Sequence, residues 1–356
     1  MGEGLLFLGV DGGGTGCRAR LSDGTGAVLG EGIAGPANIR ISLEESVRSV
    51  REATAQCLAR AGASFSDPIA ACLALAGASE PNEAAAARAA FDTRFARVLV
   101  TTDAHAACAG AHRGEDGGVI IVGTGSIGWA VLGGRSWRVG GWGFPVSDEG
   151  AGAWIGCEAV RRALWAHDGR AAWTPLLRRV SAELGADPHA IVRWMGAARP
   201  RDFARLAPLV LDQADHDDPA ATEIMQLAAG HIDTIAARLA QHGATRLALM
   251  GGIAPGIEPW LARATRARLV PPAGDALDGA LRLARSGNGV RPLASTGAER
   301  NGVRPLEPTG AENLSAGGEG SDPVSSEGSD PGPCEGSDPV LCKGLAPVHT
   351  RVRSAR

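Results

Sequence analysis

Short apolar segments and segments with helical periodicity alternate along the first 285 residues. Strands are indicated where apolar residues form continuous runs or alternate with polar or small residues. In the first part of the chain, these strands are predicted at residues 5–11, 17–21, 27–32, 69–76 and 98–102. Apolar or small residues at helical spacing between them predict helices at residues 44–61, 84–95 and 104–111.

A second series of alternating predicted strands and helices begins at Gly118. Strands are predicted at residues 119–122, 127–132, 246–250 and 269–271, and helices at residues 150–167, 173–184, 188–196, 201–212, 219–241 and 276–284. Each half therefore starts with a strand, a glycine-rich loop and a second strand, and continues into helices. This order predicts a duplicated α/β fold, with one domain over residues 1–106, another over residues 107–285, and a cleft between them.

The composition changes sharply near Ser286. Residues 288–300 and 301–313 are near-repeats, and the sequence EGSDP then starts at Glu319, Glu327 and Glu335. Both repeats are rich in glycine, proline, serine and acidic residues, so they offer too little apolar surface to offset the entropy lost on ordering. A stacked solenoid is disfavoured because the eight-residue unit has one valine or none. The sequence predicts that residues 286–356 are a disordered tail without chemistry.

The composition excludes several classes of protein. The chain has 356 residues, of which 44% are hydrophobic and 21% charged, as in ordinary globular proteins of about two domains. A net charge of −4 disfavours a nucleic-acid binder, and the absence of tyrosine leaves few rings for base stacking. No apolar run approaches the ~20 residues that cross a membrane, and we expect no signal peptide.

Cysteine spacing gives no sign of a metal site or a disulfide framework. The seven cysteines form no CxxC pair and no metal-ligand pattern. We therefore expect reduced, mostly buried thiols in a cytoplasmic protein.

The first glycine-rich segment, residues 9–16, has the sequence GVDGGGTG. Three consecutive glycines let backbone N–H groups approach an anion closely, because no Cβ stands in the way. Asp11 lies at a strand end, where a carboxylate can hold Mg²⁺ through water, and Thr15 offers a hydroxyl group. A Walker loop is excluded, since that loop needs GK[ST] followed by a helix. A flexible glycine hairpin without a ligand is the alternative.

The second glycine-rich segment, residues 123–128, has the sequence GTGSIG and follows the predicted strand VIIV. It matches the GxGxxG pattern of dinucleotide-binding folds. In those folds the glycines open a helix, whereas WAVLGG, which follows here, is typical of a strand and a turn. The pattern therefore favours a second phosphate-binding hairpin.

Acidic residues stand before two predicted helices. Asp103 lies between a strand and the helix that starts at Ala104, so it is either the N-cap of that helix or a catalytic base at the floor of a cleft. Asp148 and Glu149 follow the GGWG turn and precede a long helix. They are either helix caps or ligands for sugar hydroxyls, with the indole of Trp142 as an apolar wall.

A late segment completes the set of motifs. Residues 247–256, LALMGGIAPG, predict a buried strand, two glycines and the start of a helix. This is either an ordinary loop or a backbone surface on which a nucleotide base and ribose can lie.

The order of these motifs resembles the actin, Hsp70 and sugar-kinase superfamily, whose two domains are ribonuclease-H-like. The segments GVDGGGT, TTDA, GTGS, GGWG, SDEGAGAWIG and MGGI resemble the BadF/BadG/BcrA/BcrD ATPase family more closely, and within it the N-acetylglucosamine and glucosamine kinases. The resemblance covers about residues 5–285. It implies an ATP-dependent kinase for the 6-hydroxyl of glucosamine or N-acetylglucosamine, with ATP and Mg²⁺ as cofactors.

The resemblance also implies roles for individual residues. Asp103 matches the family's catalytic base, and Asp11 matches the family's first phosphate loop, where we expect its carboxylate to hold Mg²⁺ through water. The expected ATP-binding residues are Gly12, Gly13, Gly14, Thr15, Gly123, Thr124, Gly125, Ser126, Gly251 and Gly252. The expected substrate-binding residues are Asn38, Asp103, Gly141, Trp142, Asp148 and Glu149. Such kinases are commonly dimers, so a homodimer is compatible with the resemblance.

Two other functions are left open. Some family members are ATP-driven activators of radical dehydratases that hold an iron–sulfur cluster between subunits, for which Cys108 and Cys157 are the available cysteines. A sugar or nucleotide sensor on a kinase scaffold is the other, although an intact Asp103 counts against it. The sequence does not distinguish glucosamine from N-acetylglucosamine or another amino sugar.

Overall fold

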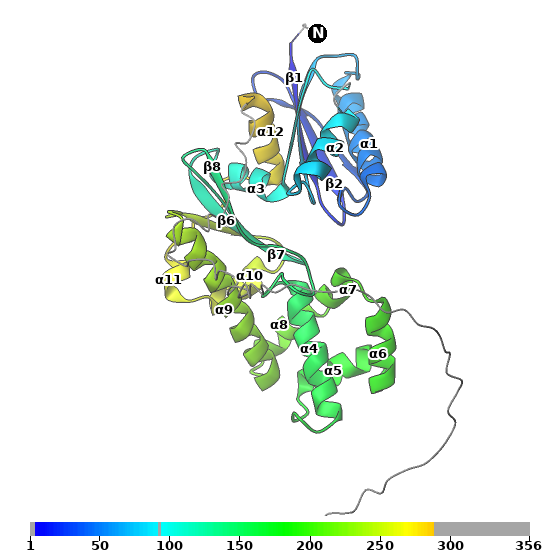
Figure 1. The fold of residues 1–356 in the computed structure, drawn as a ribbon, viewed down its shortest axis with the longest axis vertical. Coiled ribbons are helices and arrows are strands. Elements are labelled where there is room, and N and C mark those ends of the chain that lie inside the picture. The colour runs from blue at the N-terminus through cyan, green and yellow to red at the C-terminus, as the bar shows by residue number, and fades with distance from the viewer. Residues whose placement is uncertain (1–3, 92–93, 288–356) are drawn as a thin grey trace, which may run out of the picture. The chain divides into compact units, whose positions relative to one another are not determined.

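The N-terminal strands form a five-stranded mixed sheet in the computed structural model, which describes residues 4–91 and 94–287 (Figure 1). Its strands are β1 (Leu6–Gly12), β2 (Cys17–Ser22), β3 (Val28–Ala34), β4 (Ile69–Leu75) and β5 (Arg97–Thr101). The spatial order is β3-β2-β1-β4-β5; β1, β2 and β3 pair antiparallel, while β4 and β5 run parallel to β1. These strands confirm the sequence predictions to within about two residues.

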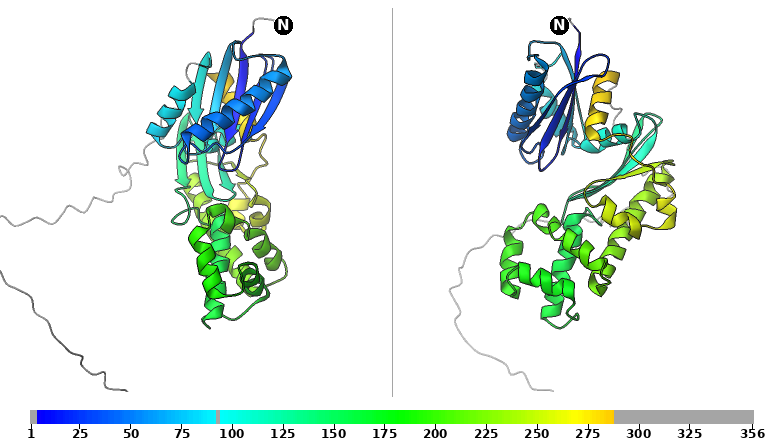
Figure 2. Two further views of the ribbon diagram at one scale, coloured as in Figure 1. Left: turned by 90° about the vertical axis from the view of Figure 1, so that its right-hand side faces the viewer. Right: turned by 180° about the vertical axis from the view of Figure 1, so that it is seen from behind.

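Helices cover both faces of this sheet because its central strands are apolar on both sides. Successive residues of a strand point to opposite faces. Leu73 and Leu75 of β4 join a core with α1 (Leu43–Ala61) and α2 (Pro81–Phe91). Cys72 and Ala74 join another core with α3 (Asp103–Ala111) and α12 (Ala276–Ser286). The last helix thus returns to the first sheet, beside which it lies in Figure 2.

A second sheet repeats most of the first. Its strands are β6 (Gly117–Val122), β7 (Ser126–Leu132), β8 (Arg135–Gly140) and β9 (Leu247–Met250), ordered β8-β7-β6-β9. β6, β7 and β8 pair antiparallel and β9 runs parallel to β6, just as β4 runs parallel to β1. The predicted duplication of an α/β unit is confirmed. The division at residues 106 and 107 stays a prediction; α12, which it assigns to the second domain, packs on β1 and β4.

The remaining helices lie between and after the strands of the second sheet. They are α4 (Gly152–His167), α5 (Pro175–Glu183), α6 (Pro188–Ala197), α7 (Pro200–Ala204), α8 (Ala207–Ala214), α9 (Pro219–Gln241), α10 (Ala254–Ile257), the 3-10 helix η1 (Glu258–Trp260) and α11 (Arg263–Arg266). Apolar residues of α4, α5, α8 and α9 form one large core with Ile120, Val122 and Ala130 of the sheet. The opposite face of the sheet packs on α3, which therefore contacts both sheets.

Three predicted elements need correction. The helix predicted at residues 201–212 is two helices, because the ring of Pro208 would clash with the carbonyl of Ala204, where α7 ends. The strand predicted at residues 269–271 is only a bridge between Leu247 and Leu269, and the prolines that follow have no N–H to extend it. The helix predicted at residues 84–95 runs from Pro81 to Phe91.

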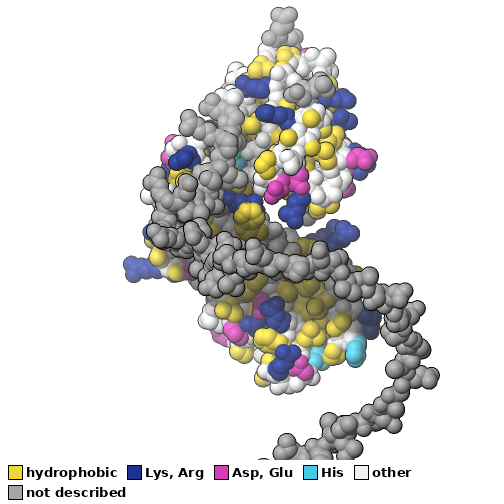
Figure 3. Space-filling view, in the orientation of Figure 1, with side chains coloured by type: hydrophobic (Ala, Val, Ile, Leu, Met, Phe, Trp, Pro, Cys, Tyr) yellow, Lys and Arg dark blue, Asp and Glu magenta, His cyan; other side chains and the backbone are white. Residues whose placement is uncertain are grey.

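The predicted tail at residues 286–356 lies outside the described residues, apart from Ser286 and Gly287 at the end of α12. Among the described residues, no helix combines the length and apolar character that crossing a membrane requires. On the described surface that Figure 3 shows, basic, acidic and apolar side chains are interspersed.

Candidate functional site

The turn between β1 and β2 presents open backbone amides. The Gly13 amide donates to the Gly16 carbonyl at 2.9 Å, which closes the turn and leaves Gly14 and Thr15 exposed at its tip. A Cβ built on Gly14 meets no atom within 4 Å, and no described residue accepts a hydrogen bond from the amides of Gly14 or Thr15. The tip can therefore take an anion. Gly12 differs, because a Cβ built on it would lie 2.7 Å from the Leu75 side chain. Glycine at this position therefore allows the backbone to pack against Leu75.

The turn between β6 and β7 is built in the same way. The Gly123 amide donates to the Gly125 carbonyl at 2.8 Å, Thr124 is exposed, and a Cβ on Gly123 meets no atom within 4 Å. Ser126 is buried and its hydroxyl donates to the Glu149 carbonyl at 2.8 Å, so that hydroxyl proton is already engaged. Two similar hairpin tips thus offer open backbone, each joining two neighbouring inner strands of its sheet.

The start of α4 is hydrogen-bonded to the second hairpin. The amides of Gly152 and Ala153 donate to the carbonyls of Gly123 and Thr124 at 2.8 and 3.0 Å, and the N-cap residue Ala151 makes no side-chain cap bond. Asp148 and Glu149 therefore do not cap α4 with their carboxylates. This removes the helix-cap alternative for both acidic residues.

The glycine pair after β9 lies against the end of β6. Gly251 has φ +101°, and a Cβ on it would lie 2.4 Å from the Val122 carbonyl oxygen, so only glycine fits there. The Ile253 amide donates to the same carbonyl at 3.0 Å. A Cβ on Gly252 meets no atom within 4 Å, which leaves that position open to a ligand beside the second hairpin.

Asp103 is the first residue of α3 rather than its cap. Thr102 is the N-cap, and its hydroxyl accepts a hydrogen bond from the His105 amide at 3.0 Å. The Asp103 carboxylate accepts from the adjacent Ala104 amide at 2.9 Å. Burial raises the pKa of Asp103, the nearby Asp11 carboxylate raises it further, and the Arg138 guanidinium opposes them. The N-cap interpretation of Asp103 is therefore wrong, although its carboxylate does bind the first-turn amide of Ala104.

Asn38 lies beside the end of β4. It forms a bridge with Ala76, and its side-chain oxygen accepts from the Arg40 amide at 3.1 Å. A Cβ on Gly77, which has φ +93°, would lie 3.1 Å from that oxygen. The side-chain oxygen is therefore bound to a backbone amide, whereas no described residue accepts a hydrogen bond from the amide group, which can donate to a ligand.

Asp148 lies against the second hairpin in an uncommon backbone conformation. Its φ is +67°, and its carboxylate accepts from the Phe144 amide at 3.2 Å. A Cβ on Gly125 would lie 2.5 Å from the same carboxylate oxygen. Burial raises the pKa of Asp148. The structure thus brings the predicted sugar-binding carboxylate next to the predicted phosphate hairpin.

The other predicted substrate residues lie in the same loop. Trp142 is 66% exposed. Gly141 has φ +72°, and a Cβ on it would lie 2.8 Å from Ile127. The Glu149 carboxylate accepts a hydrogen bond from the Ser147 hydroxyl at 3.3 Å, and this bond stabilises the loop that contains both residues.

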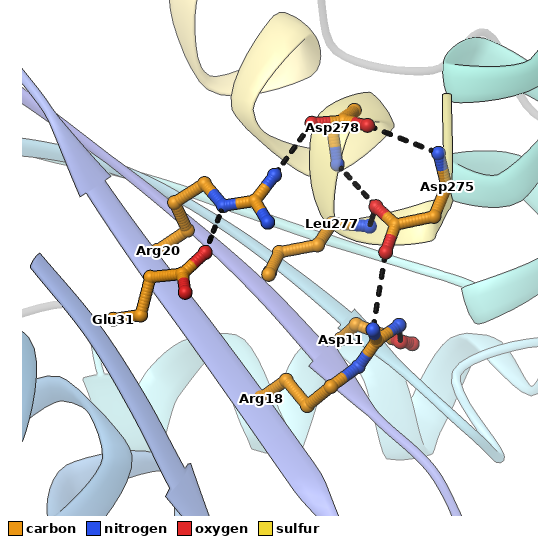
Figure 4. Close-up of polar contacts among 7 residues, drawn as sticks. All are labelled: Asp11, Arg18, Arg20, Glu31, Asp275, Leu277 and Asp278. Atoms are coloured by element: carbon orange, nitrogen blue, oxygen red, sulfur yellow. Dashed lines mark hydrogen bonds and ion pairs between the residues drawn. The ribbon is translucent and has the colours of Figure 1, made fainter. Parts of the chain in front are cut away.

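Asp11 takes part in a network of charges that joins the first hairpin to α12 (Figure 4). Arg18 lies 2.6 Å from Asp11 and 3.0 Å from Asp275, and Arg20 pairs with Glu31 and Asp278. Asp275 is the N-cap of α12. The network fixes the strands that carry the first hairpin.

The residues around Asp11 fit a magnesium ion bound mainly through a ligand. Mg²⁺ commonly takes one or two carboxylates together with phosphate oxygens and water. Asp11 lies beside a hairpin with open amides; one of its carboxylate oxygens is paired with Arg18, so the other would face the ion. Among the described residues, no group of three or more His, Cys, Asp or Glu side chains could hold a metal alone.

The cysteines do not suit an iron–sulfur cluster. Cys108 is buried, its thiol donates to the Gly117 carbonyl, and burial raises its pKa to about 12. Burial also raises the pKa of Cys157. A cluster held between subunits needs cysteines at the surface, and Cys108 is fully buried.

Sequence reasoning missed Arg138 on β8. This arginine is half-buried and within electrostatic range of both Asp103 and Asp148. The only sequence signal was its place two residues before the glycine pair of the GGWG turn.

Comparison with known proteins agrees with this geometry. The model of the BadF/BadG/BcrA/BcrD ATPase family matches residues 8–258. Glucosamine kinase GspK of Vibrio cholerae is 40% identical over 279 residues, which are 78% of this chain and 95% of that protein. An N-acetylmuramic acid/N-acetylglucosamine kinase of Clostridium acetobutylicum is 35% identical over 167 residues, 46% of this chain and 55% of that protein.

Solved structures include a proposed N-acetylglucosamine kinase from Chromobacterium violaceum. It is 36% identical, with a TM-score of 0.72, and the match covers 78% of this chain and 98% of that chain.

Proposed function

Because the chain belongs to the BadF/BadG/BcrA/BcrD ATPase family, we propose that it is an ATP-dependent kinase that phosphorylates the 6-hydroxyl of glucosamine or N-acetylglucosamine. The observation that carries the proposal is the Asp103 carboxylate. Asp103 is not the N-cap of α3, and its carboxylate lies within electrostatic range of Asp11, which precedes the tip of the first hairpin, and of Arg138 on β8. Phosphoryl transfer to an alcohol needs such a base beside a phosphate-binding backbone.

In this proposal, ATP binds to the exposed backbone of the two glycine-rich hairpin tips and of Gly252. The amides of Gly14 and Thr15, and the tip at Gly123 and Thr124, would donate to phosphate oxygens. Gly252 would lie under the adenosine. Asp11 would hold Mg²⁺ through water, and the ion would neutralise charge on the phosphate oxygens. The hairpins need little rearrangement, since their turns are closed by internal hydrogen bonds.

In this proposal, the sugar is bound by Asn38, Trp142 and Asp148. The Asn38 amide would donate to a hydroxyl, and the Asp148 carboxylate would accept from one. The exposed indole of Trp142 would cover an apolar face of the ring. Gly141 and Glu149 would shape this loop. Asp103 would accept the proton of the 6-hydroxyl as its oxygen attacks the γ-phosphate.

The proposal places the reaction in the cytoplasm, where ATP is abundant. A homodimer is the assembly that the family resemblance favours, and light scattering tests it.

A coupled assay of ADP release tests the proposal. The panel contains glucosamine, N-acetylglucosamine and N-acetylmuramic acid, with glucose as the sugar that has no amino group. We expect ADP release that depends on one of the amino sugars and exceeds the rate with glucose. Equal ADP release with and without every sugar would contradict a kinase and favour a sensor or an activator.

Replacing Asp148 with Asn should weaken sugar binding alone. Asn tolerates the positive φ of this position and can still accept from the Phe144 amide, so the melting temperature should stay near that of the unchanged protein. Loss of a charged acceptor for a hydroxyl costs about 1–3 kcal/mol, or roughly 5–150-fold in the sugar KM. The KM for ATP should stay unchanged. A normal sugar KM in a stable D148N protein would remove Asp148 from the sugar site.

A further inference from the structure

One guanidinium contacts three consecutive residues, the last residue of β8 and the first two of the loop that follows it. The Nε of Arg138 donates to the Gly140 carbonyl at 3.0 Å, and its Nη2 donates to the Gly141 carbonyl. The guanidinium carbon also lies 3.9 Å from the centre of the Trp142 ring. Only arginine offers both a planar fork for two acceptors and a flat face for stacking on an indole.

The loop needs such a brace because its own sequence is flexible. Gly140, Gly141 and Gly143 all have positive φ, at +68°, +72° and +107°. Glycine loses more conformational freedom on ordering than any other residue. Packing does not hold the indole of Trp142, which is 66% exposed. Its amide donates to the Ser147 hydroxyl at 3.3 Å, which fixes the backbone but not the ring.

The same guanidinium lies among the charges of the candidate site. Burial lowers the pKa of Arg138, while the carboxylates of Glu80, Asp148 and Asp103 raise it and the Arg40 cation lowers it. An arginine stays charged in such surroundings. Arg138 therefore braces the loop from a position that faces both carboxylates of the candidate site.

We propose that Arg138 is a positioning residue, which holds Trp142 and the Gly140–Gly143 backbone in the conformation that receives the sugar. This inference rests on the proposed function for its substrate, but the brace itself exists without substrate. The ring face that the guanidinium does not cover is the surface offered to the sugar. Without the brace, sugar binding would have to order a glycine-rich loop and would be weaker, whereas nucleotide binding would not change.

The test compares Arg138→Lys, Arg138→Met and Arg135→Met. Lysine keeps the charge but lacks the fork, and methionine lacks both. Arg135 is exposed on the same strand and serves as the matched control. We expect R138K to raise the sugar KM by about 10-fold, with kcat and the KM for ATP nearly unchanged. R138M should raise the sugar KM to a similar extent and also lower kcat at acidic pH, because the lost guanidinium no longer opposes the raised pKa of Asp103. R135M should leave all three constants unchanged.

A second readout needs no substrate. Acrylamide quenching of the Trp142 fluorescence is obtained as the difference from the same protein carrying Trp142→Phe. We expect more quenching in R138K than in the unchanged protein, because the guanidinium no longer covers one ring face. Unchanged quenching together with an unchanged sugar KM in R138K would overturn the inference, and so would a fall in kcat alone.

The two readouts separate this inference from the proposed function. If no amino sugar is phosphorylated but R138K exposes Trp142, the proposed function fails and the brace stands. If R138M unfolds, R138K decides the result alone, since it keeps the charge that faces Asp103 and Asp148.

Discussion

Replacing Asp103 with Asn should lower kcat by about 10²–10⁴-fold, the usual effect of losing a general base. The Asn side chain has the size of Asp but cannot take the proton of the attacking hydroxyl. Both substrates should still bind, so the dissociation constants for sugar and ADP should change little. Calorimetric titration and the coupled assay measure these quantities separately.

Stability provides the control for this variant. Thr102 caps α3, so D103N should melt near the temperature of the unchanged protein. Thr102→Ala removes the cap and keeps the carboxylate. It should cost about 1 kcal/mol of stability and retain turnover. A D103N protein that phosphorylates amino sugar at a near-normal rate would remove Asp103 from the mechanism.

The pH profile of kcat reports on the same carboxylate. The base must be ionised, and burial and Asp11 raise the pKa of Asp103. Activity should therefore fall on acidification at a pH above the ordinary value of about 3.9 for Asp. The residual activity of D103N should lack this decline.

The second large effect is expected at Gly251, for which Gly252 is the matched control. Alanine at Gly251 would adopt φ +101° and place its Cβ 2.4 Å from the Val122 carbonyl oxygen, which is backbone and cannot rotate away. The backbone strain alone costs about 1–3 kcal/mol, so G251A should melt several degrees lower. The shifted loop should also weaken ATP binding.

Gly252→Ala should behave differently. Its Cβ meets no protein atom within 4 Å, so the melting temperature should not change. A nucleotide lying on this backbone would meet the added methyl group, so the KM for ATP should rise. Thermal unfolding and ADP titration of both variants check this contrast. If G252A binds ADP normally, the adenosine does not lie on this loop.

Local patterns in the sequence predicted most of the fold. The hairpins β1–β2 and β6–β7 were predicted because apolar alternation on both sides of a glycine-rich turn depends only on neighbouring residues. β8 was missed, since the segment RSWRVG carries two arginines and little alternation. One of these arginines, Arg138, donates a hydrogen bond from its guanidinium to the Gly140 carbonyl, a contact that no pattern of residue types shows.

The candidate site was predicted unevenly for the same reason. Glycines mark sites of close approach, so Gly251 and Gly125 were identified, although only the structure shows that Val122 crowds the first and Asp148 the second. The roles of Asp103 and Asp148 stayed open, because an acid before a helix is also the pattern of a cap. For Asp148, the structure shows that the carbonyls of Gly123 and Thr124 accept from the first amides of α4. For Asp103, it shows that Thr102 is the N-cap, although the Asp103 carboxylate also accepts from the Ala104 amide.

The central claim is that this chain moves the γ-phosphate of ATP to the 6-hydroxyl of an amino sugar. The most direct measurement follows the reaction of ATP with glucosamine and N-acetylglucosamine by phosphorus NMR with proton coupling. The account predicts one sugar phosphate for each ADP formed, with the phosphorus signal split by the two protons on C6. Formation of ADP and inorganic phosphate without a sugar phosphate, or a phosphate on another oxygen, would contradict it.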